Sequence, residues 1–325
     1  MSIDPSAVSS GQTGTAKSGM PVLVTGATGF IGQAVVGELR AAGHAVRVLV
    51  RNPASVASQQ LMKTQGVELC AGTFSDRESL SKAVQGIGAI IHLVGIISEV
   101  GENTFQSIHV EATRNLLAAA QTLDARRYLH MSALGTRPQA ASRYHQTKWA
   151  AEELVRQSGL DWTIFRPSIV YGVRDQFTNF FARMARCSPV MPVMGAGQGK
   201  LQPIAVENVA QAFARALTEP RAIGRTFDLC GPEVFTFERL LSIVLAEAGR
   251  KRALVHLPMP VARMQARLME LIYPTLLRRA SPLTSDQLLM LQEDNVGDSE
   301  TARELFKLKF RPFAESVRAY LRMIQ

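Results

Sequence analysis

Thr25-Gly26-Ala27-Thr28-Gly29-Phe30-Ile31-Gly32 is the stretch that decides the fold of this 325-residue chain. It follows the apolar run Val22-Leu23-Val24 and precedes a helix-like segment at 33–40. We expect the first glycine to make the tight turn that leaves the strand. The second would let backbone approach a pyrophosphate, and the third would let the helix pack close to the sheet. Because a helix N-terminus attracts phosphate, the strand, turn and helix together predict a dinucleotide site.

The composition is that of a globular, basic protein. Hydrophobic residues make up 46% of the chain, mean hydropathy is +0.05 and the formal net charge is +9. A chain of this length can form one large α/β unit and a smaller lobe. The positive charge favours anionic partners, such as nucleotide phosphates or an anionic membrane surface. No nucleic-acid-binding signature is present and the basic residues are scattered, so we expect no nucleic-acid partner.

Three further features bear on location. Residues 1–19 are polar and rich in Ser, Gly and Thr, which predicts a disordered tail rather than a secretory signal. No apolar run reaches the roughly 18 residues of a transmembrane helix. Cys70, Cys187 and Cys230 lie far apart without metal-binding spacing, so we expect no metal site and a reducing compartment. A cytoplasmic protein is predicted, with a peripheral position on the inner face of the membrane left open.

Strand-like and helix-like segments alternate from residue 20 to residue 166. Strand-like runs are found at 45–50, 67–70, 89–94, 127–132 and 162–166, and helix-like runs at 55–64, 76–84, 103–123 and 144–158. This alternation predicts an α/β fold, namely a Rossmann-type doubly wound parallel sheet with ligands at the carboxyl ends of its strands. Residues 167–325 are expected to form a smaller, mostly helical substrate lobe, except that about 202–230 rejoins the sheet.

Arg51 follows the second strand, where a classical NAD site carries an acidic residue. A carboxylate there would bind the ribose 2′-hydroxyl and repel a 2′-phosphate, whereas a guanidinium binds phosphate in a bidentate manner. The sequence therefore predicts a preference for NADP(H), with NAD(H) as the weaker alternative. An exposed loop arginine without a ligand is the competing interpretation.

Tyr144 and Lys148 are four residues apart in a helix-like segment and therefore share a helix face. A nearby ammonium favours the phenolate and is expected to lower the tyrosine pKa. Such a tyrosine can act as general acid or base toward a carbonyl or alcohol. Ser132 ends a strand twelve residues before Tyr144 and would donate a hydrogen bond to a substrate carbonyl. The competing interpretations are an amphipathic surface helix and, for Ser132, a helix or turn cap.

Four features of the chain resemble the extended and atypical short-chain dehydrogenases/reductases. This group is the NAD-dependent epimerase/dehydratase superfamily. In chain order the four features are the glycine turn, Ser132, Tyr144-x-x-x-Lys148 and Arg166-Pro167-Ser168-Ile169-Val170-Tyr171-Gly172. The resemblance covers residues 21 to about 240 and, more weakly, the rest. Within the superfamily, the chain is most similar to the branch related to the short-chain-dehydrogenase-like accessory subunit of respiratory complex I. The phrases that support this branch lie at 132–135, 166–172, 177–181, 188–192, 202–206, 230–233 and 294–296.

The resemblance implies a role for each matching position. Tyr144 would be the acid/base, Lys148 would hold the nicotinamide ribose and tune Tyr144, and Ser132 would polarise the substrate carbonyl. The cofactor would be held by Thr25, Gly26, Thr28, Gly29, Phe30, Ile31, Gly32, Arg51, Leu93, Val94, Gly95, Lys148, Pro167, Ser168 and Ile169.

Three positions depart from the superfamily pattern. Gly72-Thr73-Phe74 lacks the Asp that often lies near the adenine. His109 replaces an Asn that serves as a structural or proton-relay residue, and Asn208 stands where an Asp is usual. The first two departures weaken the expectation of full activity. None removes the nucleotide pocket or the Ser, Tyr and Lys set.

Two functions remain open at this stage. One is an NADP(H)-dependent oxidoreductase that moves hydride between nicotinamide and a carbonyl, alcohol or quinone-like substrate of unknown identity. The other is a non-catalytic, nucleotide-binding accessory or assembly factor linked to complex I or quinone metabolism. A regulatory nucleotide sensor is a third function, supported by fewer features of the sequence. The arginine-flanked apolar segment 261–279 fits either a helix covering the substrate lobe or a surface against a membrane or respiratory complex.

Overall fold

The computed structural model describes residues 19–121, 126–277 and 280–324. Its larger part is a seven-stranded sheet with strand order β11-β6-β5-β4-β1-β2-β3, and all of its strand pairs are parallel. The tail predicted at 1–19 lies outside the described residues, apart from Gly19 at the start of β1. The strands are β1 (Gly19–Thr25), β2 (His44–Val50), β3 (Val67–Ala71), β4 (Ala89–His92), β5 (Arg127–Met131), β6 (Asp161–Pro167) and β11 (Arg225–Leu229).

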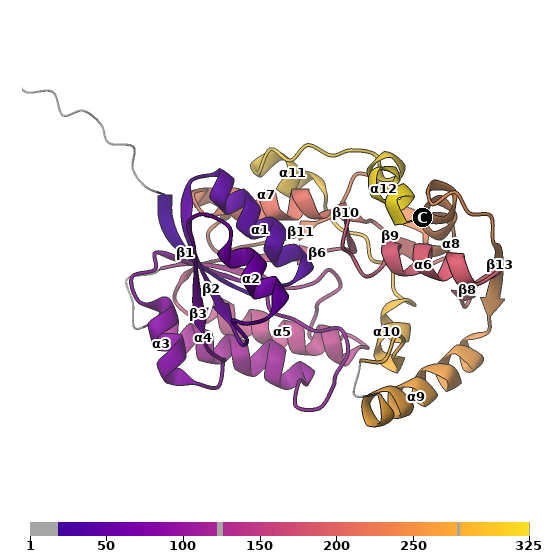
Figure 1. Ribbon diagram of the computed structural model, residues 1–325, viewed down its shortest axis with the longest axis horizontal. Coiled ribbons are helices and arrows are strands. Elements are labelled where there is room, and N and C mark those ends of the chain that lie inside the picture. Colours follow the sequence, from indigo (N-terminus) through magenta and orange to yellow (C-terminus); the bar gives the residue numbers. More distant parts are fainter. Residues whose placement is uncertain (1–18, 122–125, 278–279, 325) are drawn as a thin grey trace, which may run out of the picture.

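Helices cover both faces of this sheet, which confirms the predicted doubly wound arrangement (Figure 1). Alternate residues of one strand pack on opposite faces, because successive side chains of a strand point in opposite directions. Thus Val22 and Val24 lie in one core cluster and Leu23 lies in the other. The first cluster includes residues of α1 (Phe30–Ala41), α2 (Val56–Met62) and α7 (Val206–Ala216). The second includes residues of α3 (Arg77–Val84), α4 (Ala112–Ala120) and α5 (Arg143–Arg156).

The order of the strands reverses between β1 and β4. The chain runs outward from β1 to β2 and β3, then crosses to β4 on the other side of β1. In doubly wound sheets, ligands bind outside the carboxyl ends of the strands at this switch point. The predicted glycine turn follows β1 and residues 93–95 follow β4, so both lie at that place.

The helix predicted over 103–123 differs from the observed one. A π-helical segment, η1 (Gln106–Glu111), precedes α4, and residues 122–125 lie outside the described part of the chain. Single π-helical turns are rare and often occur at functional sites. Here the wider turn carries His109, which is buried. A π-helical turn contains one more residue than an α-helical turn, and the 3.6-residue periodicity used to predict helices does not reveal it.

The second lobe has its own hydrophobic core, to which α6, α8 and α12 contribute. It contains short strands as well as helices, among them the parallel pair β8 and β13, which the sequence did not reveal. Its helices are α6 (Thr178–Cys187), α8 (Phe237–Glu247), α9 (Met259–Leu276), α10 (Ser285–Met290), α12 (Phe313–Leu321) and the 3-10 turn η3 (Arg322–Ile324). Its strands are β7 (Val170–Tyr171), β8 (Val190–Met194), β9 (Lys200–Leu201), β10 (Ile204–Ala205), β12 (Phe235–Thr236) and β13 (Ala253–Leu257). The 3-10 turn η2 (Pro220–Ala222) belongs to the first lobe, where Ala222 lies in the core of the sheet.

The chain returns to the sheet twice after residue 167. The first return is α7 and β11, which lie within residues 202–230. The second is α11 (Glu300–Leu305), whose neighbours Phe306 and Leu308 lie in the same core cluster as α1 and α7. The sequence-based division did not include this second return. Phe306 packs edge-on against Phe165 of β6, with ring centroids 5.4 Å apart.

Candidate functional site

The glycine turn has the geometry that a dinucleotide requires. Gly26 has a positive φ of 76°, and the Gly29 N–H donates to its carbonyl oxygen at 3.0 Å. A Cβ on Gly29 would meet that oxygen at 3.2 Å. Among the described residues it would meet nothing else within 4 Å beyond its own helix and chain neighbours. Gly29 is also the N-cap of α1, so the unpaired N–H groups of the first helical turn lie beside this open approach. The turn therefore fits a pyrophosphate.

Gly32 has a different role from the one predicted. A Cβ on Gly32 would lie 2.2 Å from the Gly26 carbonyl oxygen and 2.6 Å from the Ala27 Cα. The missing side chain thus lets α1 lie against the backbone of the turn itself, rather than against the sheet. Gly26 in turn abuts the end of β4, since its Cβ would be 3.2 Å from the Val94 nitrogen. The glycine turn and residues 93–95 consequently lie against each other and form one side of the candidate site.

The predicted catalytic residues are all buried at the carboxyl ends of the strands. Ser132 follows β5, while Tyr144 and Lys148 lie in the first two turns of α5. The Lys148 Nζ donates to the Met131 carbonyl oxygen at 3.0 Å, directly beside Ser132. A Cβ on Gly95 would lie 2.9 Å from this nitrogen, so the ammonium also adjoins the loop after β4. The Ser132 hydroxyl donates to the Thr136 hydroxyl at 3.3 Å, within its own turn.

Burial, not the neighbouring charge, dominates the pKa values of this pair. The pKa of Tyr144 is raised to about 12 by desolvation, so the prediction of a lowered value is wrong for the nucleotide-free protein. The pKa of Lys148 is lowered to about 8 by the same burial, only partly opposed by Glu152. A charged group loses its hydration in a buried site, and this cost is the largest cause of both pKa shifts. Tyr144 is therefore a neutral phenol, ready to donate a proton.

Lys148→Met is expected to raise the free energy of unfolding at pH 7 by about 2 kcal/mol. The folded-state pKa is depressed, so below about pH 8 the folded protein carries a buried charge that the unfolded chain hydrates freely. Wild-type stability should rise as pH increases from about 8 toward the unfolded value near 10.5, because only the unfolded chain is then protonated. The variant should lack this rise. Urea unfolding of both proteins at pH 7 and at pH 9.5 measures the difference between their free energies of unfolding. This difference must be smaller at pH 9.5.

His109, for which the resemblance predicted the place of an Asn, lies beside Tyr144. Its Nδ1 lies 2.9 Å from the Thr147 hydroxyl, and its Nε2 lies 3.1 Å from the Ile96 carbonyl oxygen. Its ring stands edge-on to Tyr144, with centroids 5.4 Å apart. Burial and the Lys148 charge lower the pKa of His109 to about 2, so the imidazole is neutral. It therefore links the loop after β4 to α5 and forms one wall around Tyr144.

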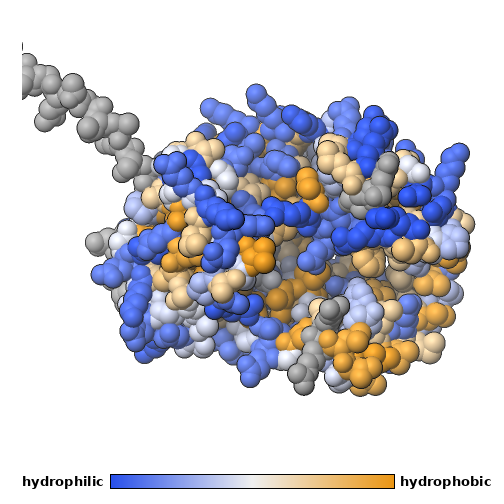
Figure 2. Space-filling model, in the orientation of Figure 1, coloured by the Kyte–Doolittle hydropathy of each residue, from blue (hydrophilic) through white to orange (hydrophobic). Residues whose placement is uncertain are grey.

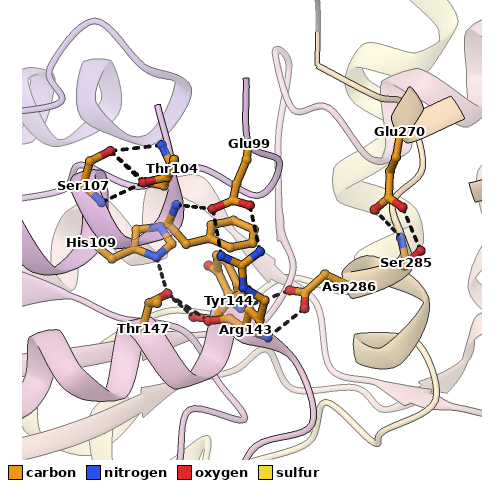
Figure 3. A network of polar contacts seen from close by, with 11 residues as sticks. Glu99, Thr104, Ser107, His109, Arg143, Tyr144, Thr147, Glu270, Ser285 and Asp286 are labelled. Carbon is orange, nitrogen blue, oxygen red and sulfur yellow. Dashed lines mark hydrogen bonds and ion pairs between the residues drawn. The ribbon is translucent and has the colours of Figure 1, made fainter. Parts of the chain in front are cut away.

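A polar network fixes the start of α5 (Figure 3). The Asp286 carboxylate on α10 accepts the backbone N–H groups of Arg143 at 2.7 Å and Tyr144 at 3.0 Å. The Arg143 guanidinium binds Glu99, which also accepts the Phe105 N–H at 2.8 Å. Asp286 lies 142 positions from Tyr144, so no local pattern pointed to it. The second lobe thereby holds the start of α5, which carries Tyr144 and Lys148, in position.

Arg51 lies exposed after β2, and its Nη1 donates to the Asn103 side-chain oxygen at 3.3 Å. Arg47, on the same strand, is directed elsewhere, to Glu68 at 2.9 Å and the Gln85 carbonyl oxygen at 2.7 Å. Only Arg51 of the two is therefore placed at the carboxyl end of the sheet. Its weak contact with a neutral amide leaves the guanidinium able to bind a phosphate.

Residues 167–169 join the sheet to the second lobe. The Pro167 carbonyl oxygen accepts the Leu134 N–H at 2.9 Å. The Ser168 hydroxyl donates to the Asn295 side-chain oxygen at 2.5 Å, and Ile169 packs against the second core. The Ser168 hydroxyl therefore has a partner within the protein, and its segment would contact a cofactor through other atoms.

Thr25 also uses its side chain internally. Its hydroxyl lies 2.7 Å from Nδ1 of His92, whose Nε2 lies 3.2 Å from the Thr113 hydroxyl. Burial lowers the pKa of His92 to about 3, so His92 is a neutral histidine of the core. Within the described residues, no group of three or more His, Cys, Asp or Glu side chains is placed to hold a metal ion. None of the described helices is long and apolar enough to span a bilayer.

A parallel sheet with reversed strand order, a glycine turn at the switch point and a phosphate-facing helix define a Rossmann-type NAD(P)-binding protein. The chain belongs to the NAD(P)H-binding family, whose model matches residues 26–220. Solved structures of a UDP-glucuronic acid 4-epimerase from Bacillus cereus, with a TM-score of 0.70 at 19% identity, and of other proteins of this kind share its fold.

Three relatives illustrate this family. The mitochondrial NADH dehydrogenase [ubiquinone] 1 alpha subcomplex subunit 9 of Arabidopsis thaliana is 30% identical over 300 residues, which cover 90% of this chain and 73% of that protein. The ceramide reductase of Caulobacter vibrioides is 29% identical over 246 residues, 74% of each chain. The structure of an NADPH-dependent quinone oxidoreductase from Escherichia coli, complexed with NADPH, has a TM-score of 0.72 at 20% identity. It covers 92% of this chain and 99% of that chain, and at this identity it shows the fold alone.

The chain spans 65% of the length of the corresponding NADH dehydrogenase subunits of Mus musculus and Rattus norvegicus. It spans 64% of the NADH-ubiquinone oxidoreductase 40 kDa subunit of Neurospora crassa. The activity and partners of those whole proteins are therefore not transferred to this chain.

Proposed function

We propose that this protein is an NADPH-dependent reductase that acts on a carbonyl or quinone-like substrate. The observation that carries the proposal is the burial of Ser132, Tyr144 and Lys148 at the carboxyl end of the sheet, beside the glycine turn. The similarity to a protein named as a ceramide reductase supports it.

Each residue has a distinct role in the proposed reaction. When bound, NADPH supplies the hydride. The Tyr144 hydroxyl donates its proton to the substrate oxygen, which suits a phenol whose pKa of about 12 keeps it protonated. Ser132 would turn its hydroxyl from Thr136 to the same oxygen. The Lys148 ammonium stabilises the phenolate that Tyr144 becomes, and Tyr144 recovers its proton from solvent.

The direct test is NADPH oxidation by the full-length protein across a panel of quinones, aldehydes and ketones. We expect at least one member to be reduced, with NADPH bound at micromolar concentration or tighter. Tight binding of NADPH without turnover of any member would reject the proposal. It would leave a nucleotide-binding accessory role, which the similarity to NADH dehydrogenase subunits favours as the second candidate. Co-purification with a respiratory complex would then test that role.

Arg51→Glu is expected to weaken NADPH binding about 100-fold while changing NADH binding by less than about threefold. Removing a charge-assisted phosphate contact and adding a like charge together cost about 3 kcal/mol, and only NADPH carries the 2′-phosphate. Isothermal titration with both nucleotides measures the two affinities. Arg239→Glu, an exposed arginine on α8, is the matched control for net charge and should leave both affinities unchanged. Equal wild-type affinities for NADPH and NADH would refute the role of Arg51.

A further inference from the structure

Helix α9 presents its large apolar side chains to solvent. The residues that pack inward, Ala262 and Ala266, are small and form a minor core cluster with Leu288 of α10. The outward side chains are large and highly exposed, namely Val261, Met264 (68%), Leu268 (57%), Leu271 (65%), Ile272 and Leu276 (77%). We refer to these six residues as the α9 face. A water-facing helix ordinarily has the opposite arrangement.

The α9 face forms a continuous apolar patch on the molecular surface. Apart from the adjacent pair Leu271 and Ile272, its residues recur at intervals of three and four, so they share one side of the helix. Figure 2 shows the hydrophobic patch at the lower right, where Figure 1 places α9. Isolated exposed apolar residues are ordinary, but a contiguous patch marks a surface that another body covers.

The charges around the α9 face are positive. Arg263 and Arg267 are exposed along one flank of the helix. The only carboxylate in the helix sequence, Glu270, is engaged inward, where it accepts the N–H and hydroxyl of Ser285, both at 2.8 Å. No acidic side chain of α9 is therefore available to a partner, and the whole chain carries a net charge of +9. An apolar stripe with flanking arginines and a net positive charge complements an anionic lipid surface.

We propose that the α9 face docks on the surface of an anionic lipid bilayer, with its apolar side chains in the interfacial region and Arg263 and Arg267 at the headgroups. A second copy of the chain would instead bring two patches of the same charge together. The helix is held rigidly for this role, because Glu270 binds Ser285 of α10, and the adjacent Asp286 caps the catalytic helix (Figure 3). Docking would therefore place the substrate lobe against the lipid surface. This proposal does not depend on the proposed reductase activity.

Sedimentation with vesicles tests the docking surface, using the full-length protein. We expect binding to vesicles of phosphatidylcholine with 30% phosphatidylglycerol, weakened by salt, and little binding to phosphatidylcholine alone. Leu268→Ser with Leu271→Ser should lower the partition coefficient about 30-fold, because each loses roughly 1 kcal/mol of apolar transfer free energy. Arg263→Gln with Arg267→Gln should lower it about 20-fold on anionic vesicles only.

Two control pairs of substitutions distinguish binding through the α9 face from non-specific adsorption of the protein to lipid. Val56→Ser with Met62→Ser removes exposed apolar side chains of α2, and Arg77→Gln with Arg114→Gln removes exposed charges of α3 and α4. Both pairs should bind vesicles like the wild type. All variants should unfold like the wild type, since the substituted side chains are exposed.

Three outcomes would overturn the proposal. The first is a wild type that does not sediment with anionic vesicles. The second is a leucine variant that binds as well as the wild type. The third is a wild-type dimer, seen by analytical ultracentrifugation without lipid, that the leucine variant converts to a monomer. That result would assign the α9 face to a second copy of the chain.

Discussion

Tyr144→Phe is expected to lower kcat roughly a thousand-fold while leaving NADPH affinity within about twofold of wild type. General acid catalysis by a positioned side chain contributes about 10² to 10⁴ in rate, and phenylalanine cannot donate a proton. The aromatic packing of Tyr144 against Phe105 and His109, with centroids 5.9 Å and 5.4 Å away, survives the substitution. Steady-state turnover and nucleotide titration on the same preparation separate the loss of chemistry from a loss of fold.

Tyr128→Phe is the matched control for this prediction. Tyr128 is buried on β5, and its hydroxyl has no hydrogen-bond partner within the described residues. Removing that hydroxyl should therefore leave both turnover and stability at least at wild-type levels. Turnover by Tyr144→Phe close to that of the wild type would remove Tyr144 from the mechanism. The reaction would then need another proton donor.

Gly32→Ala is expected to lower the free energy of unfolding by about 3 kcal/mol and to abolish nucleotide binding. The added Cβ would lie 2.2 Å from the Gly26 carbonyl oxygen and 2.9 Å from the Ala27 carbonyl carbon. Both are backbone atoms, so neither can turn aside as a flexible side chain would. The turn or the first turn of α1 must move, which displaces the phosphate site.

Gly37→Ala provides the control within the same helix. A Cβ on Gly37 would meet nothing within 4 Å among the described residues, and this glycine has no positive φ. Replacing a mid-helix glycine by alanine should raise the free energy of unfolding by up to about 1 kcal/mol. Chemical unfolding and NADPH titration of the two variants should thus show opposite changes. Equal behaviour would mean that the contact at Gly32 has no effect on the turn.

The sheet could be predicted from the sequence because its strands are buried on both faces. The run from Ala89 to Val94 is continuously apolar apart from His92, and such runs are typical of central parallel strands. Local chemistry also explains the N-cap of α3, where the Asp76 side chain accepts the Glu78 N–H, and the positive φ of Gly43 directly after α1. These features depend on residues close in sequence.

Features that depend on distant contacts could not be predicted. The pKa of Tyr144 is set by burial under η1, and the sequence suggested only its proximity to Lys148. Asp286 reaches the start of α5 only through the fold of the second lobe. Likewise, α11 joins the first core through Phe306, more than seventy residues after β11 in the sequence. Sequence periodicity cannot show which surface will cover such residues.

The outward face of α9 is a further case. The sequence pattern at 261–279 fitted both a helix covering the second lobe and a surface helix, because periodicity does not show which side of a helix faces inward. The structure buries Ala262 and Ala266 and exposes the leucines. The small side chains at the contact with α10 decide which side of α9 faces inward. A hydropathy average gives no special weight to such small residues.

The central claim, that this NAD(P)H-binding protein transfers hydride, is tested most directly in single-turnover reactions. The protein would be mixed with NADPH, either unlabelled or deuterated at the C4 position that carries the hydride, and with each quinone, aldehyde and ketone of the panel. We predict nucleotide oxidation with at least one substrate, slower for the deuterated form, and slower by roughly a thousand-fold in Tyr144→Phe. A site saturated with NADPH that stays reduced in the presence of every substrate would contradict it.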